Sequence, residues 1–449
     1  MQKIKQNRDM DTRFLIIGEV FTDVYLGIKQ FGHLERIGGI FHSCRAFSAL
    51  GVDYSIAYYS PSYLCSSIAS FSKKLFATHC YSLGIIEDAP NIMIVGDPTE
   101  AGDQQYINPL CKQAKYVPNE EISLKQIIEF VNPSDVIVYP GRFDVKSIIT
   151  ELDNYNINIH IDFHYDADNL FDIHTKHLQT AILSTSSSNF IDKFEGNADC
   201  VAKFFSEMGA RQLLLKENRG GSRVVSLVDN ITTEGFSFPV NTVHSVGVGD
   251  VFNSIFLSSQ TGKPTGYSLT LAALISASYA CTYSYDSFTQ SVKSILDNID
   301  QLSLLRGTRL PWEKRRGLNI YIAGPDFPDV NKTELNSVVD CLNYHNFAVR
   351  LPIRENGLIT ESSSEKERLE CFCNDLNMMS ECDLLIAVVL TNDPGMYVEL
   401  GMFVSTGKPA ILFNPFGICS NNFALNAPTV VCNSLTEVID KTFELLGGN

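Results

Sequence analysis

The sequence has little positive charge for its length and lacks long apolar runs. Its 449 residues include 35 Lys and Arg against 51 Asp and Glu, a formal net charge of −16. This balance argues against broad electrostatic capture of nucleic acid or an anionic membrane, but not against a small phosphate pocket. No apolar run approaches the about 20 residues that cross a bilayer, and the first residues lack the apolar centre of a signal peptide. We therefore expect a cytoplasmic protein without nucleic-acid or membrane partners.

Cysteine pairs at metal-binding or redox spacing are also missing. The twelve cysteines include no CxxC, and the closest pair is Cys371 and Cys373. Scattered cysteines of this kind favour reduced core thiols over disulfides or a metal site. The hydrophobic content of 45% is typical of a globular protein, and the length predicts two domains.

Short apolar runs alternate with helix-like stretches up to about residue 305. The clearest expected strands are 14–18, 136–139, 157–162, 181–183 and 212–215, and residues 270–281 are expected to form a tightly packed helix. This alternation predicts an α/β domain over residues 1–308 with a largely parallel sheet. The basic segment 309–317, which contains the single Trp312, has no periodicity and is interpreted as a linker. A strand at 319–323 then opens a smaller parallel-sheet domain over residues 318–449.

A Gly-x-Gly-Asp string, Gly247 to Asp250, opens a helix late in the first domain. Two glycines let backbone N–H groups approach an anion at a helix N-terminus, which suits a transferring phosphoryl group. Asp250 would then accept the proton of an attacking hydroxyl. An ordinary glycine turn is the alternative for the string alone. Its setting favours the phosphoryl site, because Asp23 and the pair Gly38-Gly39 follow the first strand upstream.

With these motifs, residues 12 to 305 resemble the ribokinase-like (PfkB) family of carbohydrate and nucleoside kinases. The family consensus is close to DTxGAGDxF, and the sequence from His244 to Phe252 reads HSVGVGDVF. The resemblance implies a ribokinase-like fold, ATP and Mg²⁺ as cofactors, and a nucleotide-binding strand and loop at 216–221. It also implies Asp250 as the catalytic base and an anion hole formed by Gly247, Val248 and Gly249. Asp23 and Gly39 would contact the hydroxyls of a sugar acceptor.

The sequence departs from that family at three places. His244 replaces the leading aspartate, and His42 and Ser43 are nearest to the position of a substrate-binding asparagine. The family's NxxE element should fall near 184–192, where Asn189 and Asp192 are the residues that could imitate it. Two interpretations stay open: an active kinase, or a retained fold that binds a nucleoside or serves as a dimerisation platform.

The string from Asp393 to Gly401 carries the most chemical information in the chain. It follows a buried strand and predicts a polar turn and a helix with Glu399 in its first turn. In an open parallel sheet, ligands bind at the carboxyl ends of the strands. We expect Glu399 to stay ionised there because the helix dipole favours negative charge, and such a carboxylate can attack carbon in covalent glycosyl transfer. The alternative treats Asp375 and Asp393 as solvated or capping residues and Glu399 as a dipole residue.

Residues 318 to 440 resemble the nucleoside 2-deoxyribosyltransferase family, whose patterns are roughly YxAGPxF, DxxxxxxxD and DxGxxxELGxA. They match Tyr321 to Phe327, Asp375 to Asp383 and Asp393 to Phe403, with Phe403 in the place of the last small residue. The resemblance implies a flavodoxin-like or Rossmann-like sheet, no cofactor or metal, and Glu399 as the nucleophile that attacks C1′. It assigns Asp375 and Asp393 to the sugar hydroxyls or to protonation of the leaving base. Gly324 to Phe327 would line the base pocket, with Phe327 stacking on the base.

Several alternatives remain open for the whole protein. Nucleosides, nucleobases or nucleotides are the expected ligands, and the covalent intermediate can be resolved by a second base or by water. A phosphate pocket would draw on Arg350, Arg354 or Lys408, which are equally suited to face solvent. Both families usually form oligomers, so a homo-oligomer is expected. The rival functions are a nucleotide or NAD hydrolase with the first domain as sensor, and a non-catalytic regulator that binds nucleosides.

Overall fold

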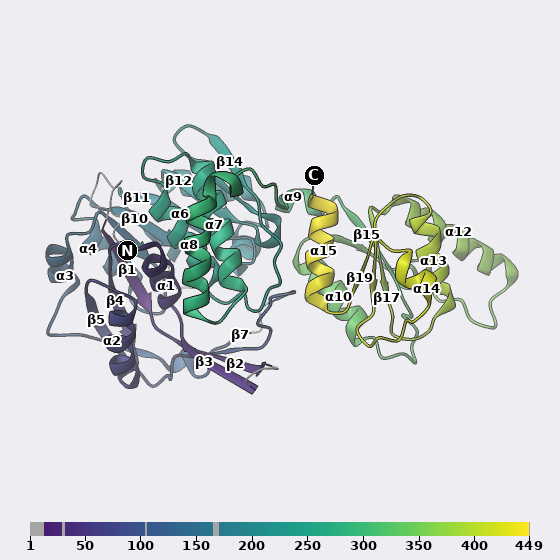
Figure 1. The fold of residues 1–449 in the computed structure, drawn as a ribbon, viewed down its shortest axis with the longest axis horizontal. Helices are drawn as coiled ribbons and strands as arrows, with labels where there is room; N and C mark the ends of the chain where they lie inside the picture. The colour runs from purple at the N-terminus through teal and green to yellow at the C-terminus, as the bar shows by residue number, and fades with distance from the viewer. Residues whose placement is uncertain (1–12, 29–31, 104–105, 165–169, 449) are drawn as a thin grey trace. The chain divides into compact units, whose positions relative to one another are not determined.

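The computed structural model describes residues 13–28, 32–103, 106–164 and 170–448. The first residues of the chain, on which the signal-peptide prediction rests, lie outside this part. The chain forms two compact units, drawn in Figure 1: unit 1 comprises Met1–Thr99 and Gln104–Arg306, and unit 2 comprises Glu100–Asp103 and Gly307–Asn449. Within the described residues, every helix is too short or too polar to cross a membrane.

A ten-stranded sheet forms the centre of unit 1. Its order is β14-β13-β12-β11-β10-β9-β1-β4-β5-β8, and the strands from β12 through β5 are all parallel. Strands β13, β14 and β8 are antiparallel additions at the two edges. The strands span Phe14–Glu19 (β1), Tyr54–Ser60 (β4), Cys80–Glu87 (β5), Lys115–Pro118 (β8), Asp135–Val138 (β9), Asn158–Asp162 (β10), Leu178–Ser184 (β11), Gln212–Lys216 (β12), Ser222–Ser226 (β13) and Ile231–Gly235 (β14).

A second sheet of unit 1 has the order β3-β2-β6-β7. Its strands are Thr22–Ile28 (β2), Gly32–Ile37 (β3), Ile92–Val95 (β6) and Tyr106–Ile107 (β7). Strand β2 follows β1 closely along the chain and carries Asp23 near its start. This sheet was not expected from the apolar pattern; β3, for example, is largely exposed and carries no apolar run.

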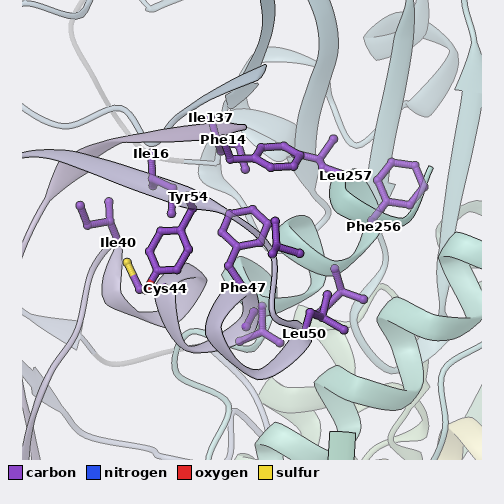
Figure 2. Packing of buried hydrophobic residues seen from close by; sticks show 14 of the residues in the cluster. Phe14, Ile16, Ile40, Cys44, Phe47, Leu50, Tyr54, Ile137, Phe256 and Leu257 are labelled. Carbon is purple, nitrogen blue, oxygen red and sulfur yellow. The ribbon is translucent and has the colours of Figure 1, made fainter. Parts of the chain in front are cut away.

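Four helices pack together on one face of the large sheet: Phe41–Leu50 (α1), Val248–Ser259 (α6), Thr265–Ala280 (α7) and Tyr285–Leu302 (α8). Figure 2 shows part of the buried cluster that these elements share, which includes Phe14 and Ile16 of β1, Phe47 of α1 and Phe256 of α6. Strand β1 is buried along its whole length, as expected for a central parallel strand covered on both faces. The other helices of unit 1 are Cys65–Lys74 (α2), Leu124–Val131 (α3), Val145–Leu152 (α4) and Ala198–Glu207 (α5).

Unit 2 contains an all-parallel sheet of order β16-β15-β17-β18-β19. Its strands are Asn319–Ala323 (β15), Ala348–Arg350 (β16), Leu384–Val388 (β17), Ala410–Phe413 (β18) and Val430–Cys432 (β19). Its helices are Trp312–Arg315 (α9), Thr333–Tyr344 (α10), Pro352–Asn356 (α11), Glu365–Glu381 (α12), Pro394–Val404 (α13), Asn422–Asn426 (α14) and Leu435–Gly447 (α15). The predicted α/β class is confirmed: a large, mostly parallel sheet and a separate, smaller parallel one.

Side-chain alternation along β15 divides the core of unit 2. Ile320 and Ile322 pack with α10 and α15 on one face, whereas Tyr321 and Ala323 pack with α12 and α13 on the other. Successive side chains of a strand point to opposite faces. Tyr321 therefore faces the helix that carries Glu399.

Residues 309–317, interpreted from the sequence as a linker, lie within unit 2. They include the short helix α9, and Trp312 and Arg315 are both buried. The Arg315 guanidinium donates from Nε to the Leu310 carbonyl at 3.0 Å and lies over the Phe443 ring, 4.8 Å from its centroid. This segment lacks hydrophobic periodicity, but it contributes to the core of unit 2 through the aliphatic part and the planar guanidinium of Arg315.

The twelve cysteines are all free thiols, as expected from their spacing. Their placement is more varied than the core positions predicted, since Cys200, Cys281 and Cys373 are exposed.

Candidate functional site

The carboxyl ends of β15 and β17 form the rim of the unit 2 sheet. Gly324 follows β15 directly, and a Cβ at this position would lie 3.2 Å from the Val388 carbonyl oxygen and 3.1 Å from Leu335. Both distances are tighter than an ordinary van der Waals contact, so a side chain here would make Leu335 or the end of β17 shift. The turn keeps the following residues, through Phe327, close to the rim.

Asp393 caps the helix that carries Glu399. Its Oδ1 accepts from the Gly395 N–H at 3.0 Å, and Pro394 is the first helical residue. Glu399 is therefore in the second turn of α13, which corrects its predicted place in the first turn. Pro394 and the Asp393 cap start the helix earlier than the hydrophobic pattern indicated.

Tyr321 holds the Glu399 carboxylate. The fully buried Tyr321 hydroxyl donates to Glu399 Oε1 at 3.0 Å. The pKa of Glu399 is raised to about 7: burial is the main cause, the Tyr321 hydrogen bond opposes the rise, and the negative charges of Asp375 and Asp393 add to it. The expectation that Glu399 stays ionised rested on the helix dipole; in the structure, burial disfavours the charged form and is the largest influence on its pKa.

Asp375 approaches the same carboxylate from α12. Its Oδ1 accepts from Asn356 Nδ2 at 2.8 Å, and the Cys371 thiol lies 3.7 Å from Oδ2. Asp375 and Asp393 thus come from different helices and both act electrostatically on Glu399. The three acids converge on one rim of the sheet.

The candidate cations for a phosphate pocket have protein partners. Arg354 donates to Asp326 at 2.6 Å, and Lys332 lies 3.0 Å from the same carboxylate. Arg350 pairs with Glu355 at 2.8 Å. Lys408 donates to the Ser380 and Cys382 carbonyls, both at 2.7 Å.

In unit 1, the N-terminus of α6 carries the glycine string. Gly247 is the N-cap residue in the left-handed region, with φ of 74°, and Val248 and Gly249 are the first helical residues. A Cβ on Gly249 would lie 3.2 Å from Lys216 Nζ. Asp250 follows and is 9% exposed. The arrangement joins a helix N-terminus, an ammonium group and a carboxylate.

Lys216 ends β12 and is held by a carboxylate at the end of β10 in the same sheet. Its Nζ lies 3.2 Å from Asp162 Oδ2, to which Asn253 of α6 also donates at 2.6 Å. The nucleotide-binding assignment included Lys216, but Asp162 and Asn253 were missed. The signal available for Asp162 was its place as the last residue of an expected strand.

Asp23 and Gly39 lie in a closed part of unit 1. Asp23 is 2% exposed, and its Oδ2 lies 3.1 Å from His42 Nε2 and 3.5 Å from Arg36 Nε. Burial acts to raise the pKa of Asp23, but the contacts with His42 and Arg36 outweigh it and the pKa is lowered. Gly39 has φ of +60°, and a Cβ there would lie 2.2 Å from the Glu19 carbonyl oxygen.

The two residues proposed to imitate the NxxE element have different surroundings. Asn189 Nδ2 donates to the Phe163 carbonyl at 3.1 Å, whereas Asp192 is exposed in the same short turn. Among the described residues, the structure contains no group of three or more side chains suited to hold a metal ion.

A family model for nucleoside 2-deoxyribosyltransferase matches residues 320–427, which include every acid of the unit 2 rim. Residues 320–427 form a nucleoside 2-deoxyribosyltransferase domain. No curated protein matches the sequence.

Solved structures that resemble the chain include sugar kinases. Ribokinase from Giardia lamblia aligns with a TM-score of 0.51 and 12% identity over 65% of this chain and 100% of its own. Arabidopsis thaliana ribokinase complexed with ribose and ATP gives 0.48 and 15% over 66% and 100%, and Xylella fastidiosa fructokinase with bound ATP gives 0.49 and 14% over 65% and 100%. At this low identity the Giardia match establishes only the fold of unit 1, which is ribokinase-like.

Within the deoxyribosyltransferase domain, the structure brings Asp375, Asp393 and Glu399 together, as the sequence motifs predicted. The role of Tyr321 was missed, although the motif contains it. Strand alternation from the two flanking isoleucines would have identified it, since it places Tyr321 opposite them and toward α13.

Proposed function

We propose that the deoxyribosyltransferase domain cleaves the N-glycosidic bond of a nucleoside or nucleotide through Glu399. The observation that carries this proposal is the hydrogen bond from buried Tyr321 to a Glu399 carboxylate at the rim of the sheet, beside two further acids. A carboxylate held in this way has one oxygen oriented by its neighbour and one left for nucleophilic attack.

In this mechanism, a Glu399 oxygen forms a bond to C1′ as the C1′–N bond breaks. The bonding electron pair leaves with the base, and Asp375 or Asp393 assists its protonation or holds the sugar hydroxyls. A second base or water then attacks C1′ and releases Glu399, so the configuration at C1′ is retained. Gly324 to Phe327 line the base side, where Phe327 is partly exposed and suited to stacking.

A chromatographic screen tests this proposal. Purified protein would be incubated with nucleosides, nucleoside monophosphates and NAD, with and without a second base. We expect base release by the wild type and a loss of at least 1000-fold in Glu399→Gln, because the amide is not a nucleophile. Glu370→Gln, an exposed glutamate of the same unit, is the matched control. Undiminished release by Glu399→Gln would rule out the covalent route.

The same screen separates the rival functions. Transfer requires the second base, whereas hydrolysis does not. Rapid loss of NAD that depends on Glu399 would favour the effector hydrolase. Absence of release from every substrate would favour the non-catalytic regulator.

We also propose that unit 1 binds ATP with its phosphates at the N-terminus of α6. The supporting observation is the Lys216 ammonium beside Gly249, with the αL N-cap Gly247 and Asp250 on either side. Backbone N–H groups and an ammonium group complement a phosphate, and Asp250 is the candidate base. Mg²⁺ would accompany the nucleotide and neutralise phosphate charge; it needs few protein ligands when phosphates supply oxygens, and Asp162 and Asp250 are the nearby carboxylates.

A homo-oligomer remains our expectation for the assembled protein. Light scattering at several concentrations measures its mass, and a monomer at all of them would contradict it.

A further inference from the structure

The two histidines that depart from the kinase consensus belong to one buried cluster. His42 lies near the start of α1, and His244 lies three residues before the N-cap of α6. Both are fully buried. Arg36 of β3 lies beside His244, with 3.4 Å separating its guanidinium nitrogens from the ring nitrogens, and it donates to the Val246 carbonyl at 2.9 Å. The two departures from the kinase consensus therefore lie in the same part of the structure.

His42 occupies the space between Asp23 and the N-terminus of α6. Its Nε2 lies 3.1 Å from Asp23 Oδ2, and its Nδ1 lies 2.8 Å from the Tyr279 hydroxyl. A Cβ on Gly247 would lie 2.1 Å from the imidazole, so the ring rests directly on the Gly247 backbone. The imidazole thus contacts both the carboxylate assigned to the acceptor and the first residue of the proposed anion hole.

Asp23 is closely enclosed on both sides of its carboxylate. Oδ1 lies against the Gly38 backbone, where a Cβ would approach to 2.1 Å, and Oδ2 faces His42 and Arg36. Arg36 is in turn enclosed by aromatic rings, with its Cζ 5.0 Å from the Tyr25 centroid and 5.5 Å from that of Tyr279. A hydroxyl that binds Asp23 would have to break buried polar contacts that it cannot all replace.

Phosphoryl transfer requires the acceptor hydroxyl to lie within hydrogen-bond reach of the base and in line with the phosphate. We infer that His42 fills this acceptor position, so that unit 1 binds a nucleoside triphosphate without passing its phosphoryl group to a sugar. This inference rests on the proposed nucleotide site of unit 1. It makes His42 the residue that determines acceptor specificity, and it favours unit 1 as a nucleotide-responsive module.

Replacing His42 with a shorter residue tests the inference in the full-length protein. Ribose and fructose are titrated calorimetrically, with and without a non-hydrolysable ATP analogue, and ADP formation from ATP is measured separately with each sugar. For the wild type we expect no sugar binding and less than a twofold rise in ADP formation. His42→Asn removes the ring, and we expect sugar affinity or sugar-dependent ADP formation to rise at least tenfold.

Two further variants complete the experiment. His33→Asn, an exposed histidine of β3, is the matched control and should behave as the wild type. Tyr279→Phe removes the hydroxyl beside Nδ1 and should give a smaller rise than His42→Asn, which keeps the test valid if His42→Asn does not fold. Sugar-dependent ADP formation by the wild type that is lost in Asp250→Asn would overturn the inference. A folded His42→Asn that binds the ATP analogue but gains no sugar binding or turnover would overturn it as well.

The outcomes distinguish this inference from the function on which it rests. If the wild type does not bind the ATP analogue, the proposed nucleotide site fails. Sugar titration of His42→Asn without nucleotide still decides whether the ring blocks the acceptor position.

Discussion

At the residue scale, the Tyr321–Glu399 pair sets the charge of the candidate nucleophile. The Glu399 carboxylate is shielded from water, and this burial is the main reason that its pKa is raised to about 7. Desolvation makes a carboxylate more reactive once it is ionised, but it also reduces the ionised fraction. The Tyr321 hydrogen bond counteracts the second effect.

The rate of base release should therefore rise with pH on the acid side. The attacking form is the carboxylate, so kcat/KM should increase about tenfold per pH unit below pH 7 and level off above about pH 8. The measurement is a pH profile of base release under single-substrate conditions. A rate that is flat from pH 5 to 8 would show that ionisation of Glu399 does not control the reaction.

Tyr321→Phe should move this profile toward higher pH. The hydroxyl stabilises the ionised form, so its removal raises the pKa of Glu399, by roughly one unit or less. Comparison of profiles for Tyr321→Phe and Tyr344→Phe, a tyrosine of α10, isolates the effect. A profile unchanged in Tyr321→Phe, with activity retained, would reduce this hydrogen bond to a packing role.

At the element scale, Asp393 has two separable roles in α13. As the N-cap it satisfies the Gly395 N–H, and asparagine can do the same. We expect Asp393→Asn to keep the melting temperature but to lose at least tenfold in base release, because the amide cannot assist protonation of the leaving base. Asp393→Ala should also lose about 1 kcal/mol of stability.

The control for Asp393 is a cap elsewhere in unit 2. Ser434 caps α15 in a capping box with Glu437, and Ser434→Ala should cost similar stability while activity is retained. If Asp393→Asn is fully active, Asp393 serves α13 as a cap alone.

The segment before β15 offers a second test at this scale. Arg315 is fully buried, and its guanidinium both donates to the Leu310 carbonyl and lies over Trp312 and Phe443. Lysine cannot reproduce a planar group that bonds and stacks at once. Arg315→Lys should therefore lose about 2 kcal/mol of unfolding free energy in denaturant titrations. Arg316→Lys, at the exposed neighbouring position, should change it by less than about 0.5 kcal/mol, and equal effects would place the segment outside the core.

At the scale of the whole molecule, each candidate site is assembled within its own unit. The contacts described for Glu399 come from β15, α12 and α13, and those for the α6 N-terminus come from β10, β12 and α1. We therefore expect Glu399→Ala to abolish base release and leave ATP binding within twofold of the wild type. Asp250→Ala should leave base release unchanged. Chromatography and calorimetry on the same preparations check this, and loss of both functions in either variant would contradict separate sites.

The sequence by itself determined the α/β class, the glycine turns and the acids of the deoxyribosyltransferase rim. These features are local: apolar runs form buried strands, and motif spacing places side chains at strand ends. It also indicated where the kinase pattern is broken, at His42 and His244, without indicating why.

Only the tertiary structure decided how these residues act on one another. The pKa of Glu399 depends on burial and on acids from separate helices, and the enclosure of Asp23 depends on β3, α1 and α7 meeting at one place. Desolvation and charge interactions depend on distance in space rather than along the chain. Sequence spacing therefore identified the candidate nucleophile, but the packing of distant elements determined the surroundings of Glu399 and the enclosure of Asp23.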